Sequence, residues 1–340
     1  MNTSTMTTTQ RTTDGTTMQA ITQDRYGEAG DVLRLEEIAR PAIGDEDVLL
    51  RVHAAGVDQG VWHLMTGLPY PVRLACGIRA PKTQVRGREV AGRVEATGSA
   101  VTALRVGDEV FGIADGSFAQ YASARPGKLA PKPANLTFAQ AAAVPVSALT
   151  ALQAVRDRGR VQAGQKVLVI GASGGVGTFA VQIAKAAGAE VTGVSSTAKL
   201  DLVRSLGADH VIDYTRDDIT AGDHRYDVIL DTGGHRPLSQ LRRTLTPRGT
   251  LVIVGSEHGG RWLGGSDRQL RALMLSPFTS QRLTTLICSE NTQDLQALTE
   301  LIESGQVRPV IDRTYPLSQI PQAIQYLRDG HPQGKVVVNL

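Results

Sequence analysis

The feature that most constrains this chain is a glycine-rich segment that directly follows a run of branched apolar residues. Residues 167–177 read VLVIGASGGVG, and residues 178–185 continue as a stretch of Ala and branched side chains with helical spacing. Gly171 and Gly174 permit a tight turn and a close approach of the backbone, and Gly177 permits close packing of a helix. Because the N-terminus of such a helix presents free N–H groups, the segment predicts a pyrophosphate-binding site.

The surrounding sequence supplies the context that this loop requires. Apolar runs typical of buried strands lie at residues 167–170, 190–194, 210–214, 226–231 and 250–254, and helical stretches separate them. This alternation predicts an α/β fold with a doubly wound parallel sheet of the Rossmann type. No Gly-Lys-Ser/Thr follows, so a P-loop is excluded, whereas a plain strand–turn–helix corner remains the alternative. The expected cofactor contacts in the loop are Gly171, Ser173, Gly174, Gly175, Val176 and Gly177.

The end of the second strand indicates which dinucleotide is bound. Sites that prefer NAD place an acidic residue there, but residues 193–199 read GVSSTAK. Ser195, Ser196 and Thr197 can donate hydrogen bonds, and Lys199 supplies a positive charge for the 2′-phosphate of NADPH. We therefore predict NADPH as the cofactor. Alternatively, Ser196 or Thr197 only caps the next helix and Lys199 is solvated, which is compatible with the same residues also binding phosphate.

Two further regions flank this cofactor domain. Residues 18–146 contain short apolar stretches broken by Gly, Pro and Asp, for example at 48–52 and 107–111, which predicts a β-rich domain. After Gly255, a polar and Gly-rich stretch precedes an expected strand at 282–287, helices at 292–304 and 318–328, and a closing strand at 335–340. We expect an extension over 1–17, a catalytic domain over 18–146, a cofactor domain over 147–280, and a segment over 281–340 that completes the sheet and returns to the first domain.

Composition and charge narrow the class of protein. With 340 residues and 41% hydrophobic content, the chain can form two domains of ordinary size. The net charge is +3 and the basic residues are scattered, so we expect no nucleic acid and no membrane as a partner. Cys76 and Cys288 are the two cysteines, which argues against a disulfide framework and a structural zinc cluster and favours the reducing cytoplasm. The Thr-rich residues 1–17 lack the apolar stretch of a secretory signal, so we expect disorder there, with a transit peptide as the alternative.

Several motifs, taken in order, resemble the medium-chain dehydrogenase/reductase superfamily, within it the quinone oxidoreductase branch, over residues 18–340. Beside the phosphate loop, they are AAGVD (54–58), GREVAG (87–92), VGDEVFG (106–112), GSFAQY (116–121), AAAVP (141–145), LGADHVIDY (206–214), DTGG (231–234) and GKVVV (334–338). The resemblance implies a GroES-like, partly barrel-shaped catalytic domain, a Rossmann domain and a cleft between them. It also implies that Tyr214 lies beside the 2′-phosphate, that Gly255 borders the nicotinamide, and that residues 283–288 form the edge of a homodimer.

The resemblance also bears on metal binding. Zinc-dependent members hold their metal with a Cys, a His and a third Cys or similar ligand, and the matching positions here are Asp58, Arg88 and Val146. An Arg side chain does not lose its proton to bind zinc, and Val has no lone pair, so we predict no catalytic metal. Without a Lewis acid, hydride addition to a quinone or an activated double bond is favoured over oxidation of a simple alcohol.

The candidate catalytic residues are Asp58, His63, Arg88 and Thr150, and the candidate substrate-binding residues are Trp62, Tyr70 and Phe278. In zinc-free relatives an Asn commonly replaces the first metal ligand, so Asp58 departs from that pattern. Asp58 can be protonated and donate, or it can form a structural ion pair with Arg88, which is the interpretation that we favour. His63 is otherwise a loop histidine, and Phe278 is explained equally well by core packing or a subunit contact.

Together these features predict a zinc-independent, NADPH-dependent oxidoreductase that transfers hydride to a small-molecule quinone, α,β-unsaturated carbonyl or related carbonyl compound. One alternative is an NAD(P)-dependent alcohol dehydrogenase. Another is a non-catalytic NADPH-binding sensor or structural protein, because a Rossmann loop indicates binding and not catalysis. A short-chain dehydrogenase is disfavoured because no Tyr is followed four residues later by Lys, and a polyketide-type enoyl reductase lacks its flanking modules here. The substrate itself is not specified by the sequence.

Overall fold

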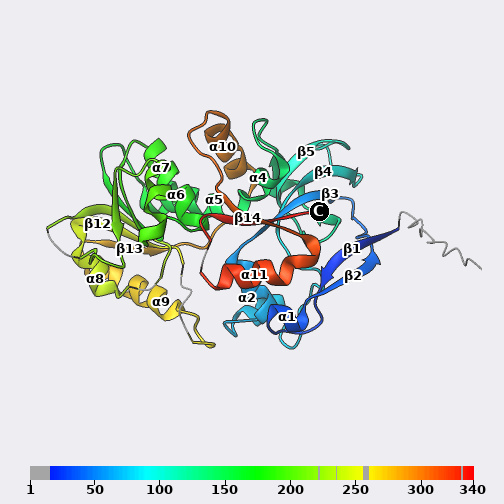
Figure 1. Cartoon of the computed structure of the whole chain (residues 1–340), viewed down its shortest axis with the longest axis horizontal. Coiled ribbons are helices and arrows are strands. Elements are labelled where there is room, and N and C mark those ends of the chain that lie inside the picture. The colour runs from blue at the N-terminus through cyan, green and yellow to red at the C-terminus, as the bar shows by residue number, and fades with distance from the viewer. Residues whose placement is uncertain (1–15, 221–222, 235, 256–259, 331) are drawn as a thin grey trace, which may run out of the picture.

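The computed structural model describes residues 16–340 apart from 221–222, 235, 256–259 and 331, and two β-sheets with their helices form its two halves (Figure 1). The expected extension over residues 1–17 lies almost wholly outside the described residues. Strand β1 begins at Thr17 and pairs with β2 (Arg34–Ala39) in a separate two-stranded sheet.

One sheet is mostly antiparallel, and most of its strands come from the N-terminal half of the chain. Its strand order is β14-β15-β3-β4-β5-β7, and β6 also pairs with β3. The strands are β3 (Val48–Val57), β4 (Glu89–Thr97), β5 (Glu109–Ile113), β6 (Tyr121–Ala124), β7 (Leu129–Pro131), β14 (Ile311–Pro316) and β15 (Lys335–Asn339). The last strand, β15, pairs antiparallel with β3, so the C-terminus of the chain lies in the sheet that its N-terminal half forms.

The second sheet contains six parallel strands in the order β10-β9-β8-β11-β12-β13. Its strands are β8 (Lys166–Ile170), β9 (Glu190–Ser195), β10 (His210–Asp213), β11 (Tyr226–Asp231), β12 (Leu245–Ile253) and β13 (Arg282–Thr285). Helices α6 (Gly175–Ala186) and α7 (Leu200–Ser205) lie on one face, and α8 (Leu238–Arg243) and α9 (Ser266–Leu275) lie on the other (Figure 1). This arrangement confirms the predicted doubly wound fold.

The central strand β8 shows why its sequence is apolar throughout. Val167 and Val169 belong to the core cluster that contains Phe179 of α6, whereas Leu168 and Ile170 pack in the cluster that contains Leu241 of α8. Successive side chains of a strand point to opposite faces, and helices cover both faces of this sheet.

Two alanine-rich helices join the two sheets, and they are α4 (Phe138–Ala142) and α5 (Pro145–Gln153). Their small side chains belong to one continuous core cluster with Ala54 and Phe111 of the first sheet and Val169 of the second. Small residues permit close approach of the backbones. The first domain is thereby held at the carboxyl ends of the parallel strands, where ligands bind in doubly wound folds.

The remaining helices are α1 (Ala29–Val32), α2 (Gln59–Thr66), α3 (Val72–Cys76), α10 (Thr292–Glu303) and α11 (Ile320–Arg328). The sequence predicted α10 and α11 closely, but it gave no indication of α9, which lies in the region expected to be irregular. No helix among the described residues is long and apolar enough to cross a membrane.

Candidate functional site

The phosphate loop between β8 and α6 has the backbone geometry that its glycines predicted. Gly171 has a φ of 80°, and Gly174 donates its N–H to the Gly171 carbonyl at 3.1 Å. A Cβ at Gly177 would lie 2.0 Å from that carbonyl oxygen, so only glycine fits there. The loop therefore leaves the first N–H groups of a twelve-residue helix facing a cradle that accommodates a pyrophosphate.

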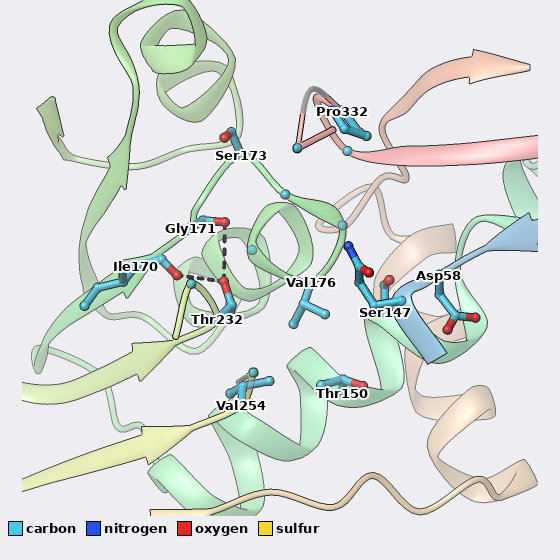
Figure 2. Close-up of a pocket in the computed structure, with 18 of the residues that line it drawn as sticks. Asp58, Ser147, Thr150, Ile170, Gly171, Ser173, Val176, Thr232, Val254 and Pro332 are labelled. Atoms are coloured by element: carbon cyan, nitrogen blue, oxygen red, sulfur yellow. Dashed lines mark hydrogen bonds between the residues drawn. The ribbon is translucent and has the colours of Figure 1, made fainter. Parts of the chain in front are cut away.

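This loop lines a cleft of about 840 Å³ to which both halves of the chain contribute. From the first half come Asp58, His63 and the start of α5, and from the second come the ends of β8, β9, β11 and β12. Figure 2 shows Asp58, Ser147 and Thr150 with Val176 of the loop and Val254 after β12 around this space. A cleft of this kind fits a dinucleotide together with a small substrate.

Most of the predicted cofactor residues line the cleft. These are the six loop residues Gly171, Ser173, Gly174, Gly175, Val176 and Gly177, together with Ser195, Ser196, Lys199, Tyr214 and Gly255. The hydroxyl of Ser195 donates to that of Ser173 at 2.8 Å, which connects the end of β9 to the loop. Lys199 donates through Nζ to the carbonyls of Gly330 and Pro332, at 3.5 and 3.2 Å, and burial lowers its pKa.

Thr197 is the exception, because it does not line the cleft. Its hydroxyl donates to the carboxylate of Asp213 at the end of β10 and lies 3.2 Å from the hydroxyl of Thr215. Thr215 also donates its hydroxyl to Asp213 at 2.7 Å, and the hydrogen bonds that this carboxylate accepts, that of Thr197 first, lower its pKa. Asp213 ends the third strand of the parallel sheet along the chain, and no role was predicted for it, because the rule for cofactor preference concerns acidic residues at the end of the second strand.

Asp58 caps helix α2. Its Oδ1 accepts the N–H groups of Gly60 and Val61, at 2.6 and 3.3 Å. Its Oδ2 is buried and accepts no hydrogen bond from the described residues. The predicted ion pair with Arg88 is wrong, because Arg88 pairs with Glu290 and does not line the cleft. Glu290 also pairs with Lys128 at 3.1 Å, so two cations hold that carboxylate.

His63 and Thr150 both line the cleft. Nδ1 of His63 lies 2.7 Å from the carbonyl of Leu68, and because a carbonyl only accepts, we assign the proton to Nδ1. Burial lowers the pKa of His63, so its neutral form is favoured. Thr150 donates its hydroxyl to the carbonyl of Val146 at 2.6 Å, and it also interacts with the thiol of Cys288.

None of the three predicted substrate-binding aromatic residues lies on the cleft wall. The guanidinium of Arg328 stacks over Trp62 at 3.8 Å, and Tyr70 packs edge-on against Trp262 at 5.1 Å. Phe278 is 85% exposed on the second domain. This corrects the expectation that these rings form the pocket.

A buried ion pair that was not predicted from the sequence lies beside the loop. Nζ of Lys335 donates to Oε2 of Glu89 at 2.6 Å and to the hydroxyl of Ser147 at 3.1 Å. Burial raises the pKa of Glu89 and the charge of Lys335 opposes this shift. The neighbouring Gly334 donates its N–H to the carbonyl of Ser173 at 2.9 Å. The Gly334-Lys335 motif carried the resemblance, but nothing in the sequence indicated its partners.

The three positions that match zinc ligands have other roles here. Asp58 is a helix cap, Arg88 pairs with Glu290, and the N–H of Val146 donates to Oε1 of Glu89 at 2.9 Å. Within the described part of the chain, no three His, Cys, Asp or Glu side chains are grouped so that they could hold a metal ion.

Comparison with known proteins agrees with this geometry. Residues 44–134 match the alcohol dehydrogenase GroES-like domain family, and residues 206–338 match a family described as zinc-binding dehydrogenase. The chain is 34% identical to the chloroplastic NADPH-dependent alkenal/one oxidoreductase of Arabidopsis thaliana, over 94% of this chain and 79% of that protein. It is 32% identical to the 2-methylene-furan-3-one reductase of Solanum lycopersicum, over 95% of this chain and 79% of that protein.

Among solved structures, the quinone oxidoreductase from Coxiella burnetii superposes with a TM-score of 0.82 at 29% identity, over 95% of this chain and 99% of that one. The order of motifs, the two sheets and the cleft between them are thus shared with proteins of this kind. The chain is an NAD(P)H-dependent oxidoreductase and belongs to the medium-chain dehydrogenase/reductase superfamily, in its quinone oxidoreductase-like branch.

Proposed function

We propose that this protein uses NADPH to reduce a quinone, an α,β-unsaturated carbonyl or a related carbonyl compound without zinc. The observation that carries the proposal is the composition of the cleft. One end has a phosphate cradle with Lys199 and Tyr214, and the other has hydroxyl, imidazole and carboxyl groups instead of a metal-ligand set. The names of the relatives, an alkenal/one oxidoreductase and a quinone oxidoreductase, support the same class of acceptor.

The residues that would hold the cofactor fall into two groups. The N–H groups of the phosphate loop and the start of α6 would bind the pyrophosphate, and Ser195, Ser196, Lys199 and Tyr214 would surround the 2′-phosphate. When bound, the dihydronicotinamide supplies the hydride. The absence of an acid among residues 193–199 favours NADPH, because a carboxylate there would repel the phosphate.

Ser147 is the best-placed hydroxyl to stabilise negative charge on the substrate oxygen. It lines the cleft, and its Oγ accepts a hydrogen bond from Lys335 at 3.1 Å. Its own hydrogen is thus available to donate, and the neighbouring ammonium makes it a stronger donor. The neutral His63 can accept a proton from solvent at Nε2 and pass it to the reduced product, since Nδ1 is held by Leu68.

We also propose a homodimer formed through the edge strand β13. This strand has a partner on one side only within the described sheet. Large apolar side chains are exposed near it, namely Leu270, Leu273, Met274, Phe278 and Ile287. An unpaired edge beside exposed apolar residues favours association with a second copy.

The proposal is tested by oxidation of NADPH and NADH in the presence of benzoquinone, phenanthrenequinone and simple enones, with chelator-treated protein. We expect turnover that prefers NADPH and survives chelation, and no oxidation of simple alcohols by NADP⁺. Loss of activity on chelation would refute the metal-independent mechanism. Tight NADPH binding without turnover on any acceptor would instead support a sensor.

A further inference from the structure

Arg236 lines the cofactor cleft but lies outside the sequence motifs named above. It follows β11, precedes α8, and lines the same cleft as Lys199 and Tyr214. Arg236 is 23% exposed, so its side chain is largely enclosed by the cleft wall. An Arg in such a position presents five N–H donors in a planar fork that matches a phosphate.

The acidic neighbour of Arg236 leaves these donors largely unused. Nη1 of Arg236 lies 3.6 Å from Oδ1 of Asp218, which is beyond hydrogen-bond distance. Asp218 is 56% exposed, and its two carboxylate oxygens already accept the N–H and the hydroxyl of Thr220, at 2.9 and 2.7 Å. Those two hydrogen bonds lower the pKa of Asp218. The ion pair is therefore loose, and the guanidinium can turn to a ligand at small cost.

The charges around the cleft are arranged for an anion. Among the described residues that line it, Asp58 is the one carboxylate, whereas Lys199, Arg236 and Lys335 carry positive charge. Lys335 is neutralised by Glu89 at 2.6 Å. Lys199 donates to the carbonyls of Gly330 and Pro332 and forms no salt bridge with a described carboxylate, although the charge of Asp312 partly opposes the lowering of its pKa by burial.

Asp213, which precedes Tyr214 of the cleft wall, could also attract these cations, but its carboxylate already accepts hydrogen bonds within the protein. Asp213 at the end of β10 accepts hydrogen bonds from Thr197 and Thr215, and Arg216 lies 3.7 Å from its Oδ2. Asp213 does not line the cleft. The cleft therefore presents Lys199 and Arg236 to an incoming ligand, and the carboxylate of Asp218, 3.6 Å from Arg236, does not itself line the cleft.

We infer that Arg236 supplies a second cation for the 2′-phosphate of the cofactor, acting together with Lys199 in the same cleft. This inference rests on the proposed preference for NADPH. It adds a specificity-determining residue that lies after the fourth strand of the parallel sheet along the chain, away from residues 193–199 at the end of the second.

The test is calorimetric titration of the whole protein with adenosine 2′,5′-bisphosphate and adenosine 5′-monophosphate, which differ by the 2′-phosphate alone. For Arg236→Gln we expect binding of the bisphosphate to weaken roughly tenfold, which corresponds to loss of one charge-assisted hydrogen bond, with binding of the monophosphate unchanged. The matched control is Arg204→Gln, since Arg204 lies on α7 outside the cleft lining and pairs with Asp201 at 2.7 Å. This control should leave the affinities for both nucleotides as in the wild type.

Each alternative result is informative. If Arg236→Gln weakens both nucleotides equally, the side chain contacts the adenosine and not the 2′-phosphate, and the inference is overturned. If neither affinity changes while Lys199→Gln weakens the bisphosphate, the inference fails and the NADPH preference stands. If the wild type binds both nucleotides equally well, the NADPH preference itself fails and the inference falls with it. A thermal melt with a wild-type midpoint shows that each variant is folded.

Discussion

Lys335 and Glu89 form a buried ion pair, with Nζ of Lys335 2.6 Å from Oε2 of Glu89 although 246 positions separate them in the sequence. Lys335 is 2% exposed and Glu89 is fully buried. Lys335 begins the closing strand β15 and also donates to Ser147 at the start of α5, while Gly334 contacts the phosphate loop. The pair thus joins two strands of the catalytic sheet, and the adjacent Gly334 links this sheet to the cofactor loop.

Removing one partner of this pair should destabilise the fold in a pH-dependent way. Lys335→Met leaves the Glu89 carboxylate buried without its cation, which typically costs about 3–5 kcal/mol. Burial already raises the pKa of Glu89, and losing Lys335 raises it further. A carboxyl whose pKa is higher in the folded state than in the unfolded state destabilises the fold as pH rises. The urea concentration at the unfolding midpoint of Lys335→Met should therefore decrease as the pH rises from about 5 to about 8.

The controls for this prediction come from the same structure. Lys128→Met removes a half-exposed partner of Glu290 and should cost less than about 1 kcal/mol. The double variant Glu89→Gln with Lys335→Met should recover part of the lost stability, because no buried charge remains. A Lys335→Met variant whose urea midpoint does not depend on pH would show that Glu89 is not the residue left unpaired.

Gly177→Ala should impair cofactor binding more than fold stability. The added Cβ would lie 2.0 Å from the Gly171 carbonyl oxygen, so the phosphate loop must shift away from α6. A shift that costs about 1–3 kcal/mol corresponds to at least a fewfold and up to a hundredfold weaker NADPH binding, measured by fluorescence titration. Gly127→Ala is the matched control, because no atom lies within 4 Å of its added Cβ. Unchanged affinity in Gly177→Ala would refute the assignment of this loop to the pyrophosphate.

Asp58 offers a test that separates helix capping from charge. Asn caps helices as well as Asp does, whereas Ala lacks the acceptor, so Asp58→Ala should lose about 1 kcal/mol of stability and Asp58→Asn only a few tenths. Chemical denaturation measures both. Equal losses in the two variants would show that the hydrogen bonds from Gly60 and Val61 to Oδ1 are not what stabilises α2.

His63 should make the protein less stable in mild acid. Burial lowers its pKa, so the unfolded chain binds a proton more readily than the folded one. The stability that neutral His63 contributes is fully present above the ordinary pKa of about 6.5. It is lost as the pH falls from there through the lower pKa of His63 in the folded protein. His63→Asn keeps a donor for the Leu68 carbonyl but does not titrate. Its stability should fall less than that of the wild type below about pH 6.5, and identical profiles for the two proteins would contradict the assignment.

Local features of this protein were predictable from the sequence, and long-range pairs were not. The phosphate loop lies within eleven consecutive residues whose glycines and flanking apolar runs specify strand, turn and helix, and the structure agrees. The pairs Arg88–Glu290 and Lys335–Glu89 join residues 202 and 246 positions apart, and no periodicity indicates such partners. An ion pair between Asp58 and Arg88 was predicted only because the two side chains have opposite charges and were both expected beside the cleft.

Helix α9 was not predicted from the sequence, for a different reason. Glycines at 259–260 and 264–265 precede it, and the segment contains Arg and Asp beside Leu270 and Met274, so the region resembles a polar loop. The apolar side chains of this helix are largely exposed and provide a weak burial pattern. In the structure, Ala272 of this helix packs in the core cluster that also contains Leu283 of β13.

The central claim, zinc-independent hydride transfer from NADPH to an activated acceptor, is tested most directly with NADPH deuterated on the transferred hydrogen at nicotinamide C4. Chelator-treated protein is incubated with an enone, and the product is examined by mass spectrometry and NMR. We predict one deuterium on the carbon β to the carbonyl, with the other new hydrogen taken from water. Product without deuterium at that carbon, or no product until zinc is restored, would contradict the claim.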